Sequence, residues 1–273
     1  MKKAIKILSL VMAVMLAVLC FTGCGANANN DNNSSEAPAV KTDLEYIKEK
    51  GTLIVGMTDY APMNYKEDGS NEWTGFDTEF ALAFGEKLGV TVEFFELADW
   101  GAKVNELNTK NIDCVWNGMT ITDELKEAMA MSNPYVINAQ VIVCKEANKD
   151  IYKDKDAIAN AKIAVEGGSA AEKLVEDLAN VTPCQNMAAT LLEVTSGTCD
   201  VAIIDITMAK AMLGEGTSYP NLVYTGSLSE EQYGIGFRKG SELCEKVNEL
   251  MAEMKADGRL QALAAKYEVA LVD

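Results

Sequence analysis

The sequence predicts an α/β protein of two lobes, joined by two chain crossings, with a ligand cleft between the lobes. Apolar strand-like runs alternate with segments of helical spacing, which is typical of a parallel sheet covered by helices. This alternation occurs twice, and two stretches link the copies: residues 135–145, which are β-rich, and residues 233–238, which are short and glycine-rich. Ligands of open α/β sheets bind at the carboxyl ends of the strands, so two facing sheets form a cleft that can close.

The first copy follows residue 50. An apolar run at residues 53–57 predicts a buried strand, and the spacing of large apolar side chains at 78–88 predicts a helix. Alternating β-rich residues at 90–97 predict a second strand. A helix-like segment and a third strand complete the copy at residues 100–107 and 111–116.

The second copy repeats the pattern. Strands are expected at residues 162–166, 181–184 and 200–204, and helices at residues 170–178, 188–196 and 206–213. Gly197 and Gly214 follow two of these helices, as expected of helix ends. The tail, residues 241–266, has helical spacing throughout.

The N-terminus has the features of an export signal. Three lysines among the first six residues precede an apolar run at residues 7–21. That run suits a signal peptide and is short for a membrane-spanning helix, which needs about 20 residues. Residues 21–24 resemble a bacterial lipobox, with Phe21 where leucine is usual. We therefore expect a signal peptide at 1–23 and a lipid on Cys24, which holds the protein outside the cytoplasm at the membrane; ordinary secretion with nearby cleavage is the alternative.

Residues 24–42 then form the lipidated cysteine and a flexible tether. The segment is rich in asparagine and serine and has no periodicity, so it buries too little apolar surface to order itself.

Composition narrows the function classes. A formal net charge of −17 argues against nucleic acid and anionic lipid as partners. The chain has no histidine, the commonest general base and metal ligand, and we expect no cofactor and no metal. Five cysteines follow the lipobox at wide spacings without a CxxC pair, which argues against zinc. We expect free, buried thiols, with one or two disulfides as the alternative, at Cys114, Cys144, Cys184, Cys199 and Cys244.

Six short motifs occur in an order that resembles a known family. They are Thr74-Gly75-Phe76-Asp77, residues 117–122 (NGMTIT), Asn133-Pro134-Tyr135, Gly168-Ser169, residues 199–205 and Tyr233-Gly234-Ile235-Gly236. From about residue 43 to 267 the chain resembles the family-3 extracellular solute-binding proteins, which bind polar amino acids for ABC importers.

The resemblance implies a type II periplasmic-binding-protein fold, with lobe one at residues 43–142 plus 231–273 and lobe two at 143–230. It implies a monomer that captures a polar amino acid by lobe closure and delivers it to an ABC permease and its ATPase. The membrane is then contacted only through the lipid anchor.

The same resemblance implies the ligand contacts. Asp205 would bind the ligand's α-ammonium together with the Gly118 carbonyl and the Thr120 hydroxyl. Tyr60 and Trp100 would flank its side chain. For three of these residues a purely structural role is the alternative. Asp205 would then cap a helix N-terminus, Thr120 would be a cap or turn residue, and Trp100 would pack in the core.

Three further residues complete this part of the predicted site. Asn117 belongs to the same turn as Gly118. Asp59 reaches a cationic ligand group or is simply a solvated turn acid. Trp116, just before the turn, is expected in the core.

The carboxylate-binding half of the predicted site departs from the family. Leu125 stands where the family has an arginine that grips the ligand carboxylate. Lys126 points roughly 100° away around a helix. Ala170 replaces a hydroxyl residue and Glu166 replaces an amide, which leaves Ser169 and the backbone N–H groups of its helix for an anion.

Two ligand hypotheses follow. The ligand is a plain polar amino acid held by Ser169, backbone amides and a lysine not yet placed, or it is an amine or modified amino acid without a tightly held carboxylate. The two arginines in residues 24–273, Arg238 and Arg259, match no cleft position.

Two other function classes fit the same fold. One is a ligand sensor that docks on a signalling partner. The other is a dehydratase-like enzyme with Glu166 as general acid. The chain lacks histidine and any nucleophile paired with a base, so we expect no enzyme activity.

Overall fold

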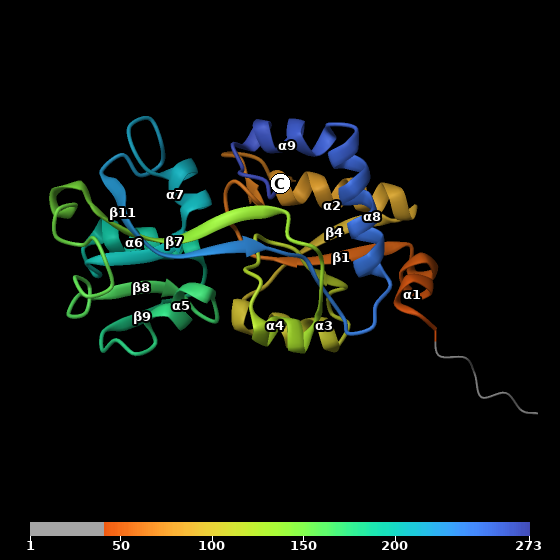
Figure 1. Ribbon diagram of the computed structural model, residues 1–273, viewed down its shortest axis with the longest axis horizontal. Coiled ribbons are helices and arrows are strands. Elements are labelled where there is room, and N and C mark those ends of the chain that lie inside the picture. The colour runs from red at the N-terminus through yellow and green to blue at the C-terminus, as the bar shows by residue number, and fades with distance from the viewer. Residues whose placement is uncertain (1–40) are drawn as a thin grey trace, which may run out of the picture. The chain divides into compact units, whose positions relative to one another are not determined.

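The computed structural model describes residues 41–273, which form one compact unit (Figure 1). The predicted signal peptide, Cys24 and nearly all of the predicted tether lie outside the described residues. None of the helices within 41–273 is long and apolar enough to cross a bilayer.

Lobe one is built on a five-stranded sheet of order β4-β1-β5-β12-β6. Its strands are β1 (Thr52–Met57), β4 (Thr91–Glu96), β5 (Cys114–Val115), β6 (Ala130–Met131) and β12 (Gly236–Phe237). The strand β1 pairs in parallel with β4 and β5, whereas β12 is antiparallel to β5 and β6. The sheet is therefore mixed, not purely parallel as the sequence pattern predicted.

Helices cover both faces of this sheet. Figure 1 shows α2, α8 and α9 on one side and α3 and α4 on the other. Their bounds are α2 (Phe76–Leu88), α3 (Lys103–Asn108), α4 (Asp123–Ala128), α8 (Leu243–Ala256) and α9 (Arg259–Tyr267). The tail is thus two helices, because Gly258 takes the left-handed conformation (φ 83°) between them.

Lobe two is built on a second five-stranded sheet, of order β11-β7-β10-β8-β9. Its strands are β7 (Val136–Lys145), β8 (Ile163–Glu166), β9 (Val181–Cys184), β10 (Val201–Asp205) and β11 (Leu222–Tyr233). The helices α5 (Ala170–Val175), α6 (Met187–Ser196) and α7 (Ile206–Met212) follow β8, β9 and β10. These three strands and three helices confirm the predicted second copy, although α5 ends at Val175, before the expected residue 178.

The two crossings are β7 and β11, which pair antiparallel from Tyr233↔Val136 to Leu222↔Lys145. Figure 1 shows this ribbon running from the lobe-two sheet toward lobe one. The sequence placed the second crossing at residues 233–238, which is wrong in extent. The crossing strand ends at Tyr233, and only Gly236–Phe237 form the next strand, inside lobe one. The lobe boundaries drawn from the resemblance stay a prediction.

Several smaller elements were not anticipated. They are α1 (Asp43–Lys50), β2 (Tyr65–Lys66), β3 (Trp73–Thr74) and the 3₁₀ turn η2 (Glu146–Asn148). The helix-like segment expected at residues 100–107 is a 3₁₀ turn, η1 (Trp100–Ala102), followed by α3. The strand expected at residues 111–116 is only two residues long, because the chain turns toward the cleft at Trp116.

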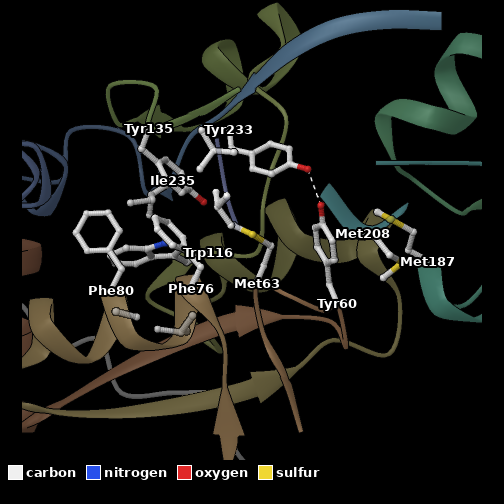
Figure 2. Close-up of a cluster of buried hydrophobic side chains, with 14 of the residues drawn as sticks. Tyr60, Met63, Phe76, Phe80, Trp116, Tyr135, Met187, Met208, Tyr233 and Ile235 are labelled. Atoms are coloured by element: carbon white, nitrogen blue, oxygen red, sulfur yellow. Dashed lines mark hydrogen bonds between the residues drawn. The ribbon is translucent and has the colours of Figure 1, made fainter. Parts of the chain in front are cut away.

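The core of lobe one is an aromatic cluster on α2 and the strands beside it (Figure 2). The ring of Trp116 meets Phe80 edge-on at 4.9 Å between centroids, and Tyr135 stacks on Phe76 at 6.1 Å. Trp116 is fully buried, which confirms its prediction as a core residue. Within residues 41–273 all five thiols are free; Cys114, Cys144 and Cys199 are buried, and Cys184 and Cys244 are half-buried.

Candidate ligand-binding cleft

A cleft of about 800 Å³ opens between the lobes. Its walls come from the carboxyl ends of β1, β5, β8 and β10, where open α/β sheets place their ligands. All predicted site residues except one line it: Tyr60, Trp100, Asn117, Gly118, Thr120, Leu125, Glu166, Ser169, Ala170 and Asp205. The exception is Asp59, which is exposed outside the cleft lining. The turn that carries it directs Tyr60, not Asp59, inward.

Asp205 is almost fully buried at the end of β10. It holds the N-cap position of α7, but its side chain makes no capping hydrogen bond. Instead its Oδ1 accepts a hydrogen bond from the Gln140 amide. Burial, reinforced by the nearby Glu231 carboxylate, raises the pKa of Asp205 to about 7. The carboxyl group therefore has a geometry suited to a ligand cation and no role as a helix cap.

Glu231, on the crossing strand β11, is a second acid beside Asp205 that the sequence did not suggest. Its Oε1 accepts hydrogen bonds from the Thr120 hydroxyl (2.8 Å), the Asn138 amide (2.6 Å) and the Gln140 amide (2.8 Å). Gln140 thus bridges the two carboxyl groups. Because the Thr120 hydroxyl donates its proton to Glu231, its lone pairs remain for a donor such as an ammonium group.

Gly118 shapes the floor of the cleft. It has φ +55°, and a Cβ there would lie 2.6 Å from the Tyr60 ring. Its N–H donates to Asp77 Oδ2 at 2.6 Å, and the Tyr135 hydroxyl reaches both Asp77 oxygens at 2.9 Å. Burial raises the pKa of Asp77 to about 7. Asp77 therefore fixes the predicted ligand turn from below, which gives a physical reason for the aspartate of the Thr74–Asp77 motif.

Tyr60 is less available to a ligand than expected. The ring is 2% exposed, and its hydroxyl oxygen lies 2.5 Å from that of Tyr233, pointing toward the crossing strand (Figure 2). Tyr60 nevertheless belongs to the cleft lining. The Asn117 side chain is also engaged within the protein, because its Oδ1 accepts hydrogen bonds from both the N–H (3.0 Å) and the hydroxyl (2.9 Å) of Thr58.

Trp100 and Lys103 form another part of the cleft lining. Trp100 belongs to a buried cluster and also lines the cleft, so it combines both roles considered for it. The Lys103 ammonium lies 4.7 Å from the centroid of the Trp100 ring and donates to the carbonyls of Trp100 (3.1 Å) and Gly168 (3.0 Å). Gly168 belongs to lobe two, so Lys103 connects the lobes. Burial lowers the pKa of Lys103 to about 8.

Glu166 faces Lys103 and Asp205 from the end of β8. It is 4% exposed and accepts a long hydrogen bond from the Thr58 hydroxyl of lobe one (3.4 Å). Burial, with a smaller effect from Asp205, raises the pKa of Glu166 to about 8. At neutral pH this carboxyl group is therefore largely protonated, and it adds less negative charge than the sequence suggested.

The start of α5 offers fewer anion contacts than the sequence suggested. The Ser169 hydroxyl accepts from the Glu172 N–H (3.2 Å), and the Gly168 N–H donates to the Glu172 carboxylate (2.7 Å). The Ser169 N–H donates to the Glu166 carbonyl. Ala170 lines the cleft without a polar side chain. The groups expected to bind the ligand's carboxylate therefore mostly make hydrogen bonds within lobe two instead.

Leu125 lines the cleft on the first turn of α4, and Lys126 lies outside the lining and pairs with Asp123. Arg238 is buried in lobe one, where it binds Asp43 and Asp113. Arg259 pairs with Asp257 on the surface. Within residues 41–273 no arginine therefore reaches the cleft.

A cleft lined by the strand ends of two α/β lobes, with buried carboxyl groups on one wall, defines a type II two-lobed binding protein. The chain belongs to the bacterial extracellular solute-binding proteins, family 3, whose sequence model matches residues 53–270.

Individual relatives agree. An L-cystine-binding protein of Escherichia coli K12 is 31% identical over 230 residues, covering 82% of this chain and 85% of the relative. An amino acid ABC transporter substrate-binding protein from Streptococcus pneumoniae, solved with L-arginine, has a TM-score of 0.75 at 29% identity and covers 85% of this chain and 100% of that one. The ancestral amino acid-binding protein AncCDT-1, a precursor of cyclohexadienyl dehydratase, has a TM-score of 0.74 at 33% identity, covering 82% and 98%.

Proposed function

We propose that this protein is the substrate-binding component of an ABC importer and captures a polar amino acid by closure of its two lobes. The observation that carries the proposal is the pair of carboxyl groups of the buried Asp205 and the half-buried Glu231, bridged by Gln140 and next to the Thr120 hydroxyl. An α-ammonium group has three donors and needs acceptors of this kind. Burying such a cation is favourable only where it meets an opposite charge.

The comparisons support an amino-acid ligand. The curated relative named above binds L-cystine, and the Streptococcus pneumoniae structure holds L-arginine. Close relatives are binding proteins, which favours capture over catalysis. Leu125 keeps the second hypothesis open, an amine or modified amino acid whose carboxylate is not tightly held.

Closure follows from the contacts between the lobes. Ligand meets lobe one first, at Trp100, Gly118 and Thr120. Lobe two then brings Asp205 over the ammonium group. The closed form is favoured only by what the ligand gains from both lobes together.

We further propose that the signal at residues 1–23 exports the protein and that a lipid on Cys24 anchors it beside the permease and ATPase as a monomer. A tether raises the local concentration of captured ligand at the permease. Intact-mass measurement of the mature N-terminus checks this anchor. An unmodified N-terminus at another position would contradict it.

A ligand panel tests the function. The purified protein is heated with each standard amino acid and L-cystine, and with the decarboxylated amine of each. We expect a rise in melting temperature with one or a few free amino acids. Stabilisation by amines but not amino acids would select the second hypothesis, and stabilisation by neither would contradict the proposed function.

Asp205→Ala tests the role of the carboxyl pair. We expect loss of binding with an unchanged circular dichroism spectrum, because the variant removes a buried acid that makes no helix cap. Asp177→Ala is the matched control, since this lobe-two aspartate is exposed and pairs with Lys155 away from the cleft. A ligand without an amino group that binds well would contradict the role given to Asp205.

A further inference from the structure

The cleft carries carboxyl groups on one side and few basic groups. Asp205 and Glu166 line it, and Glu231 lies next to Asp205 outside the lining, joined to it through Gln140. Within the described residues, the basic side chains that line the cleft are Lys103 and Lys173. An amino acid brings a carboxylate as well as an ammonium group, and a buried carboxylate without a counter-charge is costly.

Lys173 is poorly suited to this task. Its side chain is 70% exposed and pairs with Glu176 at 2.7 Å on the same helix. An exposed pair of this kind contributes little free energy, because water screens both charges.

Lys103 differs in each respect. The residue is 6% exposed, lies within the first turn of α3 and forms no ion pair with any carboxylate of residues 41–273. Its hydrogen-bond partners are two neutral carbonyls, of Trp100 and Gly168. An ammonium group has three donors, so one is left for a further acceptor in the cleft. Lys103 is thus a buried cation with neutral partners and one free donor. A bound anion would supply both the missing hydrogen bond and the opposite charge.

The other groups near Lys103 that could bind an anion already make hydrogen bonds within the protein. The Ser169 hydroxyl and the N–H groups of Gly168 and Ser169 all bond within lobe two. Leu125, which packs against the lobe-one cluster that contains Trp100, provides only apolar surface to the cleft.

We propose that Lys103 binds the ligand's carboxylate and takes the part that an arginine at position 125 would otherwise have. This inference rests on the proposed function and names the group that recognises a free amino acid. Because Lys103 belongs to lobe one and touches Gly168 of lobe two, a carboxylate at this point contacts both lobes. Binding of the carboxylate would then favour the closed form.

The test compares free acids with their α-carboxamides. Lys103→Met keeps the length and apolar stem of the side chain and removes the charge. Affinities are measured by calorimetry for L-arginine, L-glutamine and L-cystine and for the matching carboxamides. For the free acids that bind the wild type, we expect a loss of roughly 10- to 100-fold, the usual size of a buried charged hydrogen bond. For the carboxamides we expect a change below about 3-fold, since a neutral amide gains less from a cation.

Two controls separate this role from a structural one. Lys126→Met, at an exposed lysine outside the cleft lining, should leave all affinities unchanged, and Lys103→Arg should keep the preference for acids over carboxamides. An equal loss for acids and carboxamides in Lys103→Met would overturn the proposal, because it would mean that Lys103 only joins the lobes. If Lys103→Met fails to fold, Lys103→Gln gives the same comparison.

The proposed function has its own outcome. If the wild type binds none of the acids in calorimetry or in the full panel, the amino-acid function itself is contradicted, and the inference about Lys103 falls with it. If the wild type binds and Lys103→Met does not distinguish acid from carboxamide, only the inference about Lys103 is wrong.

Discussion

The hydroxyl oxygens of Tyr60 and Tyr233 lie 2.5 Å apart in the buried interior of the protein (Figure 2). Tyr60 follows the first strand of lobe one, and Tyr233 ends the crossing strand β11. Both hydroxyls lie close enough to Asp205 to lower its pKa against the effect of burial. The pair thus joins the ligand-facing loop, the crossing strand and the predicted ammonium site.

Tyr233→Phe removes one hydroxyl of this pair and leaves the Tyr60 hydroxyl with Asp205 as its remaining neighbour. We expect the free energy of unfolding to fall by about 1 kcal/mol, the usual net contribution of one hydrogen bond, with weaker ligand binding. Chemical denaturation and calorimetry measure the two effects. Tyr224→Phe, on the same strand but 42% exposed, should change stability by less than about 0.5 kcal/mol. Equal effects of the two variants would contradict the role of the hydroxyl pair.

Gly118→Ala tests the turn beneath the ligand. The new Cβ would lie 2.6 Å from the Tyr60 ring at a residue with φ +55°, so strain and steric overlap act together. We expect a loss of binding and a destabilisation of more than about 2 kcal/mol. Gly89→Ala is the matched control, because Gly89 has φ +74° with nothing within 4 Å of the added Cβ. It should show the backbone strain alone, about 1–2 kcal/mol, with ligand affinity unchanged.

The ligand-free protein should become less stable as pH rises through the neutral range. Burial raises the pKa of Asp205 and of Asp77 from 3.8 to about 7, and of Glu166 from 4.5 to about 8. Between about pH 4 and pH 8 the folded state therefore keeps protons that the unfolded chain releases, so stability falls with rising pH. Above about pH 8, Lys103 acts in the opposite direction, because its lowered pKa leaves the folded state with fewer protons than the unfolded chain.

Melting temperatures at constant ionic strength between pH 5 and 8 measure this slope. In Glu166→Gln one of these three acids no longer titrates, so the decrease should be smaller by on the order of 1–4 kcal/mol in unfolding free energy. Glu176→Gln, on the surface of lobe two, should keep the wild-type slope. An unchanged slope in Glu166→Gln would mean that this carboxyl group is ionised in the folded protein.

The parts of the fold that the sequence predicted well are those where burial is complete. The strands β1, β8 and β10 carry continuous apolar runs because helices cover both faces of the sheet at those points. The strand β11 was missed because one side of it is exposed and its pairing with β7 shifts register between Tyr224 and Ser229. The hydrophobic pattern of this strand therefore does not follow the simple two-residue alternation that identifies a strand.

The site shows a similar division. Gly118, Thr120 and Asp205 lie in short motifs and could be placed by resemblance. Gln140 and Glu231 could not, because they meet Asp205 only through strand pairing: Gln140 lies opposite Asp205 on one side and Ser229 on the other. One signal was available. Asn138 and Gln140 interrupt an otherwise apolar strand at alternate positions, and such residues share one face.

Leu125→Arg tests the orientation of the ligand in the cleft. Leu125 lies at the third position of α4, whose start is capped by Thr122, and its side chain lines the cleft. An arginine there would present a planar pair of donors that suits a carboxylate. We expect free amino acids to bind about 10-fold more tightly and their α-carboxamides to gain less than half as much in free energy.

A matched variant and a double variant complete this test. Lys126→Arg, one residue on and outside the cleft lining, should change nothing. If Lys103 and an arginine at position 125 reach the same carboxylate, Leu125→Arg should restore acid binding in the Lys103→Met background and leave carboxamide binding low. The absence of any gain in the single variant would place the carboxylate elsewhere. A gain that is equal for acid and carboxamide would show that the arginine contacts another part of the ligand, because only a charge interaction distinguishes the two.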